Sequence, residues 1–284
     1  PVGTGLSLEA YLAQAETGLL HRGLSERAPP LDLEGGRRLK VGVGLGTAYL
    51  VLVVLDEDGT PLAGEWQFAQ VVRDGLVVDF IGATDLLRGM KARVERRLGR
   101  ELTHAATGYP PGVPTAEVRA TGHVLESAGL ECTGLVDEPS AANNVLKLRR
   151  GAIVDVGGGT TGVAVIEDGQ VVYTADEATG GTHFSLVIAG SLNIPFEEAE
   201  ALKVQPSQHA RLFPLVRPVM EKVASITARH IQGRAVEQIT LVGGSSAFQG
   251  MARVVEQYTG VRTTIPSHPV FVTPLGMAWH DPAA

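Results

Sequence analysis

The sequence predicts an α/β protein built from two similar halves, each with a mixed sheet flanked by helices. Two observations support this fold class. A pattern of strand, glycine turn, strand, turn and strand begins at Leu39 and recurs at Ala152, and helical periodicity follows the strands in both halves. Such a repeat is typical of two related layered domains. We therefore expect an N-terminal helix and linker over residues 1–38, a first domain over 39–150 completed by 266–284, and a second domain over 151–265.

Length and composition limit the function classes. The 284 residues suffice for two domains that each bury a core. The net charge is −7, and no basic stretch is interleaved with aromatic residues, so nucleic acid is not expected as a partner. Cys132 is the single cysteine, which fits a reducing cytoplasm. No apolar run is long enough to span a bilayer. We expect a cytoplasmic protein.

The N-terminal segment has a helical pattern of its own. Leu8, Tyr11, Leu12, Ala15 and Leu19 recur at helical spacing, and a stretch rich in proline, glycine and polar residues follows. The helix can dock on the body of the protein, or it can serve as a short amphipathic address for a protein shell. The sequence leaves both interpretations open.

The remaining elements follow in chain order. The first half is expected to hold strands at 39–43, 49–55, 62–72, 104–107 and 135–136, and helices at 84–98, 115–128 and from Asp137 to about residue 148. The second half is expected to hold strands at 152–156, 162–167, 171–175, 239–242 and 261–265, and helices at 182–190, 195–203, 218–233, 247–258 and from about Pro274. Pro218 is assigned to a first helical turn, because an interior proline removes a hydrogen bond.

The glycine turns suggest a phosphate site. A tight hairpin tip can direct several backbone N–H groups into one concavity, and glycine allows close approach of an anion. The turns at 44–47 and 157–160 occupy equivalent points of the repeat, and Thr47 and Thr160 add hydroxyl groups. A dinucleotide fingerprint must open a helix, whereas a strand follows Gly46; a P-loop needs Gly-Lys-Ser or Gly-Lys-Thr, which is absent. Either turn alone would suit an ordinary hairpin.

Four segments resemble motifs of the actin, Hsp70 and sugar-kinase superfamily. Residues 154–162 (VDVGGGTTG) resemble its second phosphate loop, 137–142 (DEPSAA) its first connecting segment, 241–246 (LVGGSS) its adenosine loop, and 274–278 (PLGMA) its second connecting helix. They occur in the order expected of that superfamily. The resemblance implies a duplicated ribonuclease H-like (actin-like ATPase) fold, with two domains around a nucleotide cleft that binds ATP or ADP with Mg²⁺.

Three further segments resemble the EutJ family of ethanolamine-utilization proteins: residues 71–80, 125–131 and 175–181. This resemblance implies a chaperone or reactivating factor that acts in ethanolamine utilization. Its implied partners are an adenine nucleotide and an ethanolamine-utilization enzyme or microcompartment protein. The implied location is the cytoplasm, in association with a bacterial microcompartment.

The superfamily resemblance also implies site residues. Asp155 would hold the Mg²⁺ through water, and Glu138 would position the attacking water. The implied nucleotide-binding residues are Gly44, Gly46, Thr47, Gly157, Gly158, Gly159, Thr160, Thr161, Gly180, Gly181, Glu200, Lys203, Gly243, Gly244, Ser245 and Ser246. For Glu200 and Lys203 an exposed helix with an i,i+3 ion pair is the alternative.

One position departs from the superfamily pattern. The first phosphate loop of the superfamily begins Asp-x-Gly-Thr, whereas this chain has Gly44-Leu45-Gly46-Thr47, and the internal repeat places Gly44 opposite Asp155. Removing one electrostatic group from such a site costs about 3 kcal/mol, or roughly a hundredfold in rate. We expect binding with at most slow ATP hydrolysis. A scaffold or interaction protein without useful nucleotide affinity is the alternative. A small-molecule kinase ranks lower because no carboxylate base is evident, and filament formation stays open.

Overall fold

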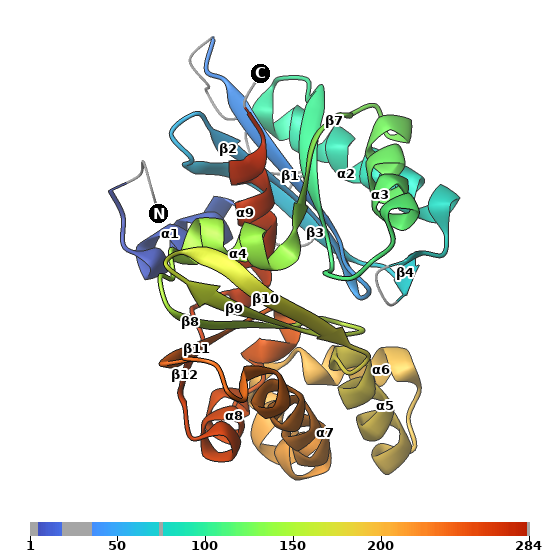
Figure 1. The fold of residues 1–284 in the computed structure, drawn as a ribbon. Helices are drawn as coiled ribbons and strands as arrows, with labels where there is room; N and C mark the ends of the chain where they lie inside the picture. The colour runs from blue at the N-terminus through green and yellow to red at the C-terminus, as the bar shows by residue number, and fades with distance from the viewer. Residues whose placement is uncertain (1–4, 19–35, 74–75, 283–284) are drawn as a thin grey trace. The chain divides into compact units, whose positions relative to one another are not determined.

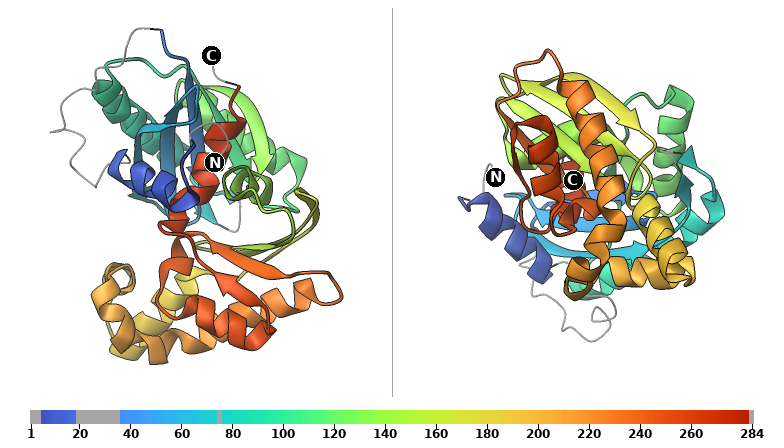
Figure 2. Two further views of the ribbon diagram at one scale, coloured as in Figure 1. Left: turned by 90° about the vertical axis from the view of Figure 1, so that its left-hand side faces the viewer. Right: turned by 90° about the horizontal axis from the view of Figure 1, so that it is seen from below.

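The computed structural model describes residues 5–18, 36–73 and 76–282. The chain divides into two compact units (Figures 1 and 2), the first made of Pro1–Lys147 with Phe271–Ala284 and the second of Leu148–Val270. Each unit has its own sheet and its own apolar core. The predicted linker falls largely on residues 19–35, outside the described residues.

The elements of the first unit are α1 (Leu8–Gly18), β1 (Leu39–Leu45), β2 (Tyr49–Asp56), β3 (Pro61–Phe68), β4 (Val72–Arg73), β5 (Leu76–Val77), α2 (Phe80–Leu98), β6 (His104–Tyr109), α3 (Thr115–Ser127), β7 (Glu131–Asp137), α4 (Glu138–Leu146) and α9 (Val272–His280). Those of the second unit are β8 (Gly151–Val156), β9 (Thr161–Glu167), β10 (Gln170–Glu177), α5 (Gly181–Leu192), α6 (Phe196–Lys203), α7 (His209–Ile231), β11 (Gln238–Val242), α8 (Met251–Thr259) and β12 (Arg262–Thr264). Short 3₁₀ turns precede α7, α8 and α9, and the turn before α8 is η2 (Gly244–Ala247).

The two main sheets have the same strand order, which confirms the predicted repeat. The order is β3-β2-β1-β6-β7 in the first unit and β10-β9-β8-β11-β12 in the second. In each sheet the first three strands along the chain are antiparallel, and the last two run parallel to the central strand. Gly44 pairs with Val51, and Asp155 pairs with Gly162. The two positions are therefore structural counterparts.

Strand β1 is buried along most of its length because helices cover both faces of its sheet. Its apolar side chains, such as Val41 and Val43, join the core beneath α2 and α3. On the opposite face Gly42 meets α9, where an added Cβ would lie 2.5 Å from the Ala278 backbone nitrogen and 2.6 Å from the Pro274 carbonyl oxygen. Helix α9 can pack this closely on the strand only where side chains are missing.

A buried carboxylate fastens the end of α9 to the sheet. Asp281, just after the helix, is 1% exposed. It accepts hydrogen bonds from the Val41 N–H at 2.8 Å and the Thr133 hydroxyl at 2.5 Å, and its Oδ2 lies 3.1 Å from His104 Nε2. Such a carboxylate is tolerated because donors surround it.

Helix α1 docks on the first unit, in agreement with the first of the two interpretations that the sequence left open. Tyr11, Leu12 and Ala15 are fully buried, and the helix packs against β3. The Trp279 indole N–H of α9 donates to the Tyr11 hydroxyl at 3.0 Å. The apolar face of α1 is thus occupied by the protein itself.

Helix α7 begins earlier than predicted, and the assignment of Pro218 to a first turn was wrong. The helix starts at His209 and holds both Pro214 and Pro218 in its interior. These prolines lie four residues apart on one side of the helix, and both are exposed. The carbonyls left without a helical partner belong to Ala210 and Pro214, both exposed residues, so water can satisfy them. Leu212, Val216 and Met220 pack inward.

Other boundaries shift by a few residues. Helix α2 starts at Phe80 rather than at residue 84, because Asp79 caps it by accepting a hydrogen bond from the Gly82 N–H at 2.8 Å. The strand expected over 62–72 divides into β3 and the short β4. Among the residues that the structure describes, no helix is both long and apolar enough to cross a bilayer.

Candidate functional site

The two glycine turns have the same hydrogen bond. The Gly157 N–H donates to the Thr160 carbonyl, and the Gly46 N–H donates to the Tyr49 carbonyl, both at 3.0 Å. Tyr49 is therefore the counterpart of Thr160, and Thr47 is the counterpart of Gly158. The two turns share a backbone shape but present hydroxyl groups at different points.

In the second unit the carbonyls of the turn face the protein. Gly157 O accepts from the Gly181 N–H at 2.8 Å, and Gly158 O accepts from the Thr182 N–H at 2.7 Å, so the first turn of α5 is tied to the loop. Within the described residues, no hydrogen bond takes up the N–H groups of Gly158 and Gly159. A loop whose Gly157 and Gly158 carbonyls are bonded to α5, and whose next two amides are available, can bind an anion.

Close packing requires glycine at position 180, just before α5. A Cβ on Gly180 would lie 2.7 Å from Gly157 O and 2.8 Å from Gly158 O, and one on Gly181 would lie 2.2 Å from Ser245 Oγ. The backbone leaves no room for a side chain at Gly180, whereas at Gly181 the Ser245 side chain would have to move. The segment reaches the phosphate loop because residue 180 is glycine.

The predicted adenosine loop is joined to the same place. The Ser245 hydroxyl donates to Gly157 O at 2.9 Å, and the Ser246 hydroxyl donates to Val242 O at 2.6 Å at the end of β11. Gly243 has a φ of +85°, and a Cβ there would lie 2.2 Å from Asp155 Oδ1. A Cβ on Gly244 would meet nothing closer than 3.5 Å, so packing does not require glycine there.

Asp155 lies where it can support a metal held through water. It is near the carboxyl end of β8, half-buried, immediately before the phosphate loop and against Gly243. Within the described residues, no group of three or more His, Cys, Asp or Glu side chains forms a metal cage. Mg²⁺ often keeps most of its waters and takes phosphate oxygens with one or two carboxylates. The residues present fit that mode of binding.

Glu200 and Lys203 form the i,i+3 ion pair of the alternative interpretation, but the pair is buried, so the expected exposure was wrong. The two side chains are 8% exposed and lie 2.6 Å apart, Glu200 Oε2 to Lys203 Nζ. Lys203 Nζ also donates to Gly181 O at 3.1 Å, and the Ser185 hydroxyl donates to Glu200 Oε2 at 2.6 Å. Burial lowers the pKa of Lys203, and Glu200 offsets part of that effect. The network ties α6 to the first turn of α5.

The structure thus brings the site residues predicted in the second unit into one neighbourhood. It adds two that the sequence did not single out, Ser185 on α5 and His209 at the start of α7. No local motif marks them, because their partners lie far away in sequence. Thr161 is fully buried, and its hydroxyl donates to Thr179 O at 2.6 Å, so this side chain has a protein partner.

The residues predicted in the first unit lie near one edge of its sheet. Gly44 is near the carboxyl end of β1, and Gly46 and Thr47 form the turn that follows. Glu138 begins α4 at the carboxyl end of β7, where the Asp137 carboxylate caps the helix by accepting from the Ser140 N–H at 2.9 Å. Because β1, β6 and β7 are parallel, these carboxyl ends share one edge.

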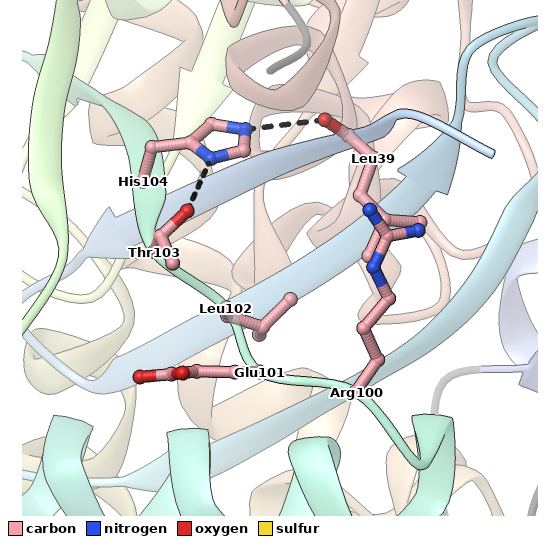
Figure 3. A pocket seen from close by; sticks show the side chains of 6 residues that line it. All are labelled: Leu39, Arg100, Glu101, Leu102, Thr103 and His104. Atoms are coloured by element: carbon pink, nitrogen blue, oxygen red, sulfur yellow. Dashed lines mark hydrogen bonds between the residues drawn. The ribbon is translucent and has the colours of Figure 1, made fainter. Parts of the chain in front are cut away.

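A separate cavity of about 300 Å³ opens near the amino ends of β1 and β6. It is lined by Leu39, Arg100, Glu101, Leu102, Thr103 and His104. Figure 3 shows the His104 ring bonded to the Thr103 hydroxyl and to Leu39 O, at 3.1 and 3.2 Å. None of the predicted site residues lines this cavity.

Comparison with protein families gives two matches. The model for the cell division protein FtsA matches residues 152–276, and the model for the MreB/Mbl protein matches residues 63–211. Two solved structures share the fold at low identity: MreB5 of Spiroplasma citri bound to ADP, at 18% identity and a TM-score of 0.68, and the PilM-PilN type IV pilus biogenesis complex, at 15% and 0.69. The first covers 84% of this chain and 94% of its own chain, the second 85% and 98%.

Similar proteins include two that match over most of both chains and one that matches over a smaller part. The ethanolamine utilization protein EutJ of Escherichia coli (strain K12) is 44% identical over 84% of this chain and 85% of its own length. The crystal structure of EutJ from Carboxydothermus hydrogenoformans has 46% identity and a TM-score of 0.87, covering 95% of this chain and 97% of that one. A chaperone protein HscA homolog of Laribacter hongkongensis (strain HLHK9) is 31% identical over 52% of this chain, but only 25% of its own length is covered.

Identity of 44–46% over most of both chains shows the family. The MreB5 and PilM structures share the fold. The chain has the actin-like ATPase fold, and it belongs to the EutJ family of ethanolamine utilization proteins.

Proposed function

We propose that this protein binds an adenine nucleotide with Mg²⁺ and acts as a chaperone or reactivating factor in ethanolamine utilization. One observation carries the nucleotide part: four segments far apart in sequence converge in the second unit, where the loop backbones leave no room for a side chain at Gly180 or Gly243. Loop amides of this kind suit a polyphosphate. In this proposal the second unit supplies the phosphate and adenosine loops, and Thr47 and Glu138 of the first unit are further candidate nucleotide-site residues.

The proposed role in ethanolamine utilization is supported by the names of similar proteins. The EutJ proteins are named for ethanolamine utilization, the HscA relatives are named as chaperones, and the MreB5 neighbour was solved with ADP. The client would be an ethanolamine-utilization enzyme or a microcompartment protein. Nucleotide-dependent capture of such an enzyme, stronger with one of ATP and ADP than with the other, is the expected result.

Gly44 favours slow hydrolysis. It occupies the counterpart position of Asp155, so the first unit supplies no carboxylate there. A protein that binds but turns over slowly suits a switch, because a ligand shifts a conformational equilibrium by its differential affinity for the two states. The same residue favours the second candidate, a scaffold of the ethanolamine microcompartment that keeps the fold without useful nucleotide affinity.

Thermal unfolding separates the two candidates. A ligand that binds only the native state stabilises it by about 2.7 kcal/mol at a hundred times its Kd. We expect Mg-ATP or Mg-ADP to raise the Tm of the wild type, and we expect Asp155→Asn to lose the magnesium-dependent part of the rise. Gly190→Ala, on α5 with nothing within 4 Å of its Cβ, is the control that should respond like wild type. An unchanged Tm at millimolar nucleotide would favour the scaffold.

A further inference from the structure

His209 connects the two segments that carry the predicted nucleoside contacts. It is the first residue of α7 and is 4% exposed. Its Nε2 lies 2.8 Å from the carbonyl oxygen of Lys203, at the end of α6, and its Nδ1 lies 3.2 Å from the backbone nitrogen of Gln249, just after η2. One imidazole thus bridges the helix of Glu200 and Lys203 to the loop of Ser245 and Ser246.

The two hydrogen bonds fix one form of the ring. A backbone N–H can only donate, so the bond from Gln249 requires a bare Nδ1. A carbonyl can only accept, so the bond to Lys203 O requires the proton on Nε2. The neutral Nε2–H tautomer satisfies both partners. A charged imidazole would set an N–H against the N–H of Gln249.

Stacked rings extend the bridge to α5. The His209 ring stacks on Phe248 with centroids 4.0 Å apart and an interplanar angle of 17°. Phe248 meets Phe184 of α5 edge to face at 6.0 Å. Both phenylalanines are buried. The ring of His209 therefore lies in a buried contact between α6 and η2, and Phe248 links it to α5.

We propose that His209 is a positioning residue that sets the spacing between α6 and the η2 loop, and thereby the affinity for the nucleoside part of an adenine nucleotide. This inference rests on the proposed nucleotide-binding function. The phosphate loop has supports that do not involve η2, the hydrogen bonds from the Gly181 and Thr182 N–H groups of α5. Loss of the His209 bridge should therefore affect nucleoside recognition and leave polyphosphate binding in place.

The test compares two ligands and two variants of the full chain. His209→Phe keeps a ring on Phe248 but removes both hydrogen bonds, whereas His209→Gln offers an amide that can accept from Gln249 and donate to Lys203 O. The two hydrogen bonds of His209 hold α6 and the η2 loop in place, and each makes a modest net contribution to stability. If binding has to restore that arrangement, their loss weakens the Kd for Mg-ADP by about tenfold. Calorimetry should show this loss for His209→Phe, a partial recovery for His209→Gln, and inorganic tripolyphosphate binding within about twofold of wild type in both.

Several outcomes would overturn the proposal. Equal losses of ADP and tripolyphosphate affinity would assign His209 a general structural role, as would a His209→Gln variant no better than His209→Phe. Unchanged ADP binding in both variants would show that the bridge does not matter, with nucleotide binding itself intact. A wild-type protein that binds neither ligand would instead remove the proposed function, and this inference with it.

Discussion

Gly44 has room for the acid that the superfamily pattern places there. A Cβ at this position would lie 3.4 Å from Pro274 Cγ and 3.9 Å from Met277 Sδ, both ordinary contact distances, and the backbone is regular strand. By contrast, a Cβ on Gly46 would lie 2.8 Å from Tyr49 O. Glycine at 46 is thus required by the turn, whereas glycine at 44 is not required by packing. Packing therefore does not explain why this chain lacks a carboxylate at position 44.

Gly44→Asp should therefore fold and change turnover. We expect slow ATP hydrolysis in the wild type, with the variant up to about a hundredfold faster if the new carboxylate reaches its proper place. The Kd for Mg-ATP should change much less, because the phosphate-loop amides of the second unit are untouched. Steady-state phosphate release with both proteins measures this. Substantial and equal rates would contradict the assignment of slow hydrolysis to Gly44.

His209 also predicts a pH dependence of stability. Burial lowers the pKa of His209, and its hydrogen bond to Lys203 O offsets part of this. A histidine whose pKa is lower in the folded than in the unfolded protein contributes stability that is fully present above the unfolded value of about 6.5. That contribution is lost as the pH falls through the folded pKa.

The measurement is urea unfolding of wild type and His209→Gln between pH 8 and pH 5. Carboxylates titrate in both proteins, so the informative quantity is the difference in unfolding free energy between them. It should shrink as the pH falls. A difference that stays constant over this range would show that His209 is not the titrating group.

At the scale of elements, α4 and α9 contact each other through a glycine. A Cβ on Gly276 would lie 1.7 Å from the Ala141 carbonyl oxygen, and Asn144 Nδ2 donates to Gly276 O at 3.4 Å. The two segments that resemble the connecting elements of the superfamily therefore pack backbone to backbone. Alanine at 276 must push the helices apart.

We expect Gly276→Ala to destabilise the protein by about 1–3 kcal/mol, the usual cost of overpacking. The matched control is Gly190→Ala on α5, where nothing lies within 4 Å of the added Cβ. There, alanine should stabilise the helix by up to about 1 kcal/mol. Chemical denaturation of both variants gives the comparison. Similar effects of the two substitutions would argue against close packing at Gly276.

The elements also show where sequence patterns are reliable. Strands such as β1 and β8 were located because buried apolar runs next to glycine turns have few other interpretations. The sequence predicts a later start for α7, because an interior proline removes a helical hydrogen bond and therefore disfavours a helix that runs through Pro214 and Pro218. Pro214 and Pro218 are both exposed, and the helix is stabilised by its buried face, so packing outweighed the local preference.

At the scale of the whole molecule, the two units differ in how the chain builds them. The second unit is one continuous segment, Leu148–Val270, whereas the first is completed by Phe271–Ala284. Trp279 of α9 donates to the Tyr11 hydroxyl, and Asp281, just after α9, accepts from the Val41 N–H. The sheet of the first unit therefore depends on the C-terminal segment.

A fragment of residues 148–270 should fold alone, because it holds a complete sheet and its own apolar core. A fragment of residues 1–147 should fail to fold, because it lacks α9 and Asp281. Circular dichroism and cooperative urea unfolding of the two fragments provide the test. A cooperatively folded 1–147 fragment would show that α9 is dispensable for the first unit.

The sequence by itself determined the α/β class, the duplication, and the glycine turns at equivalent points of each half, because alternation and glycine placement are local signals. It also located Asp155 and the missing acid at Gly44. Tertiary structure alone decided that Glu200 and Lys203 are buried, that α1 docks, and that Ser185 and His209 join the neighbourhood of the predicted site. Those features depend on contacts between residues far apart in the chain, and no local pattern encodes such contacts.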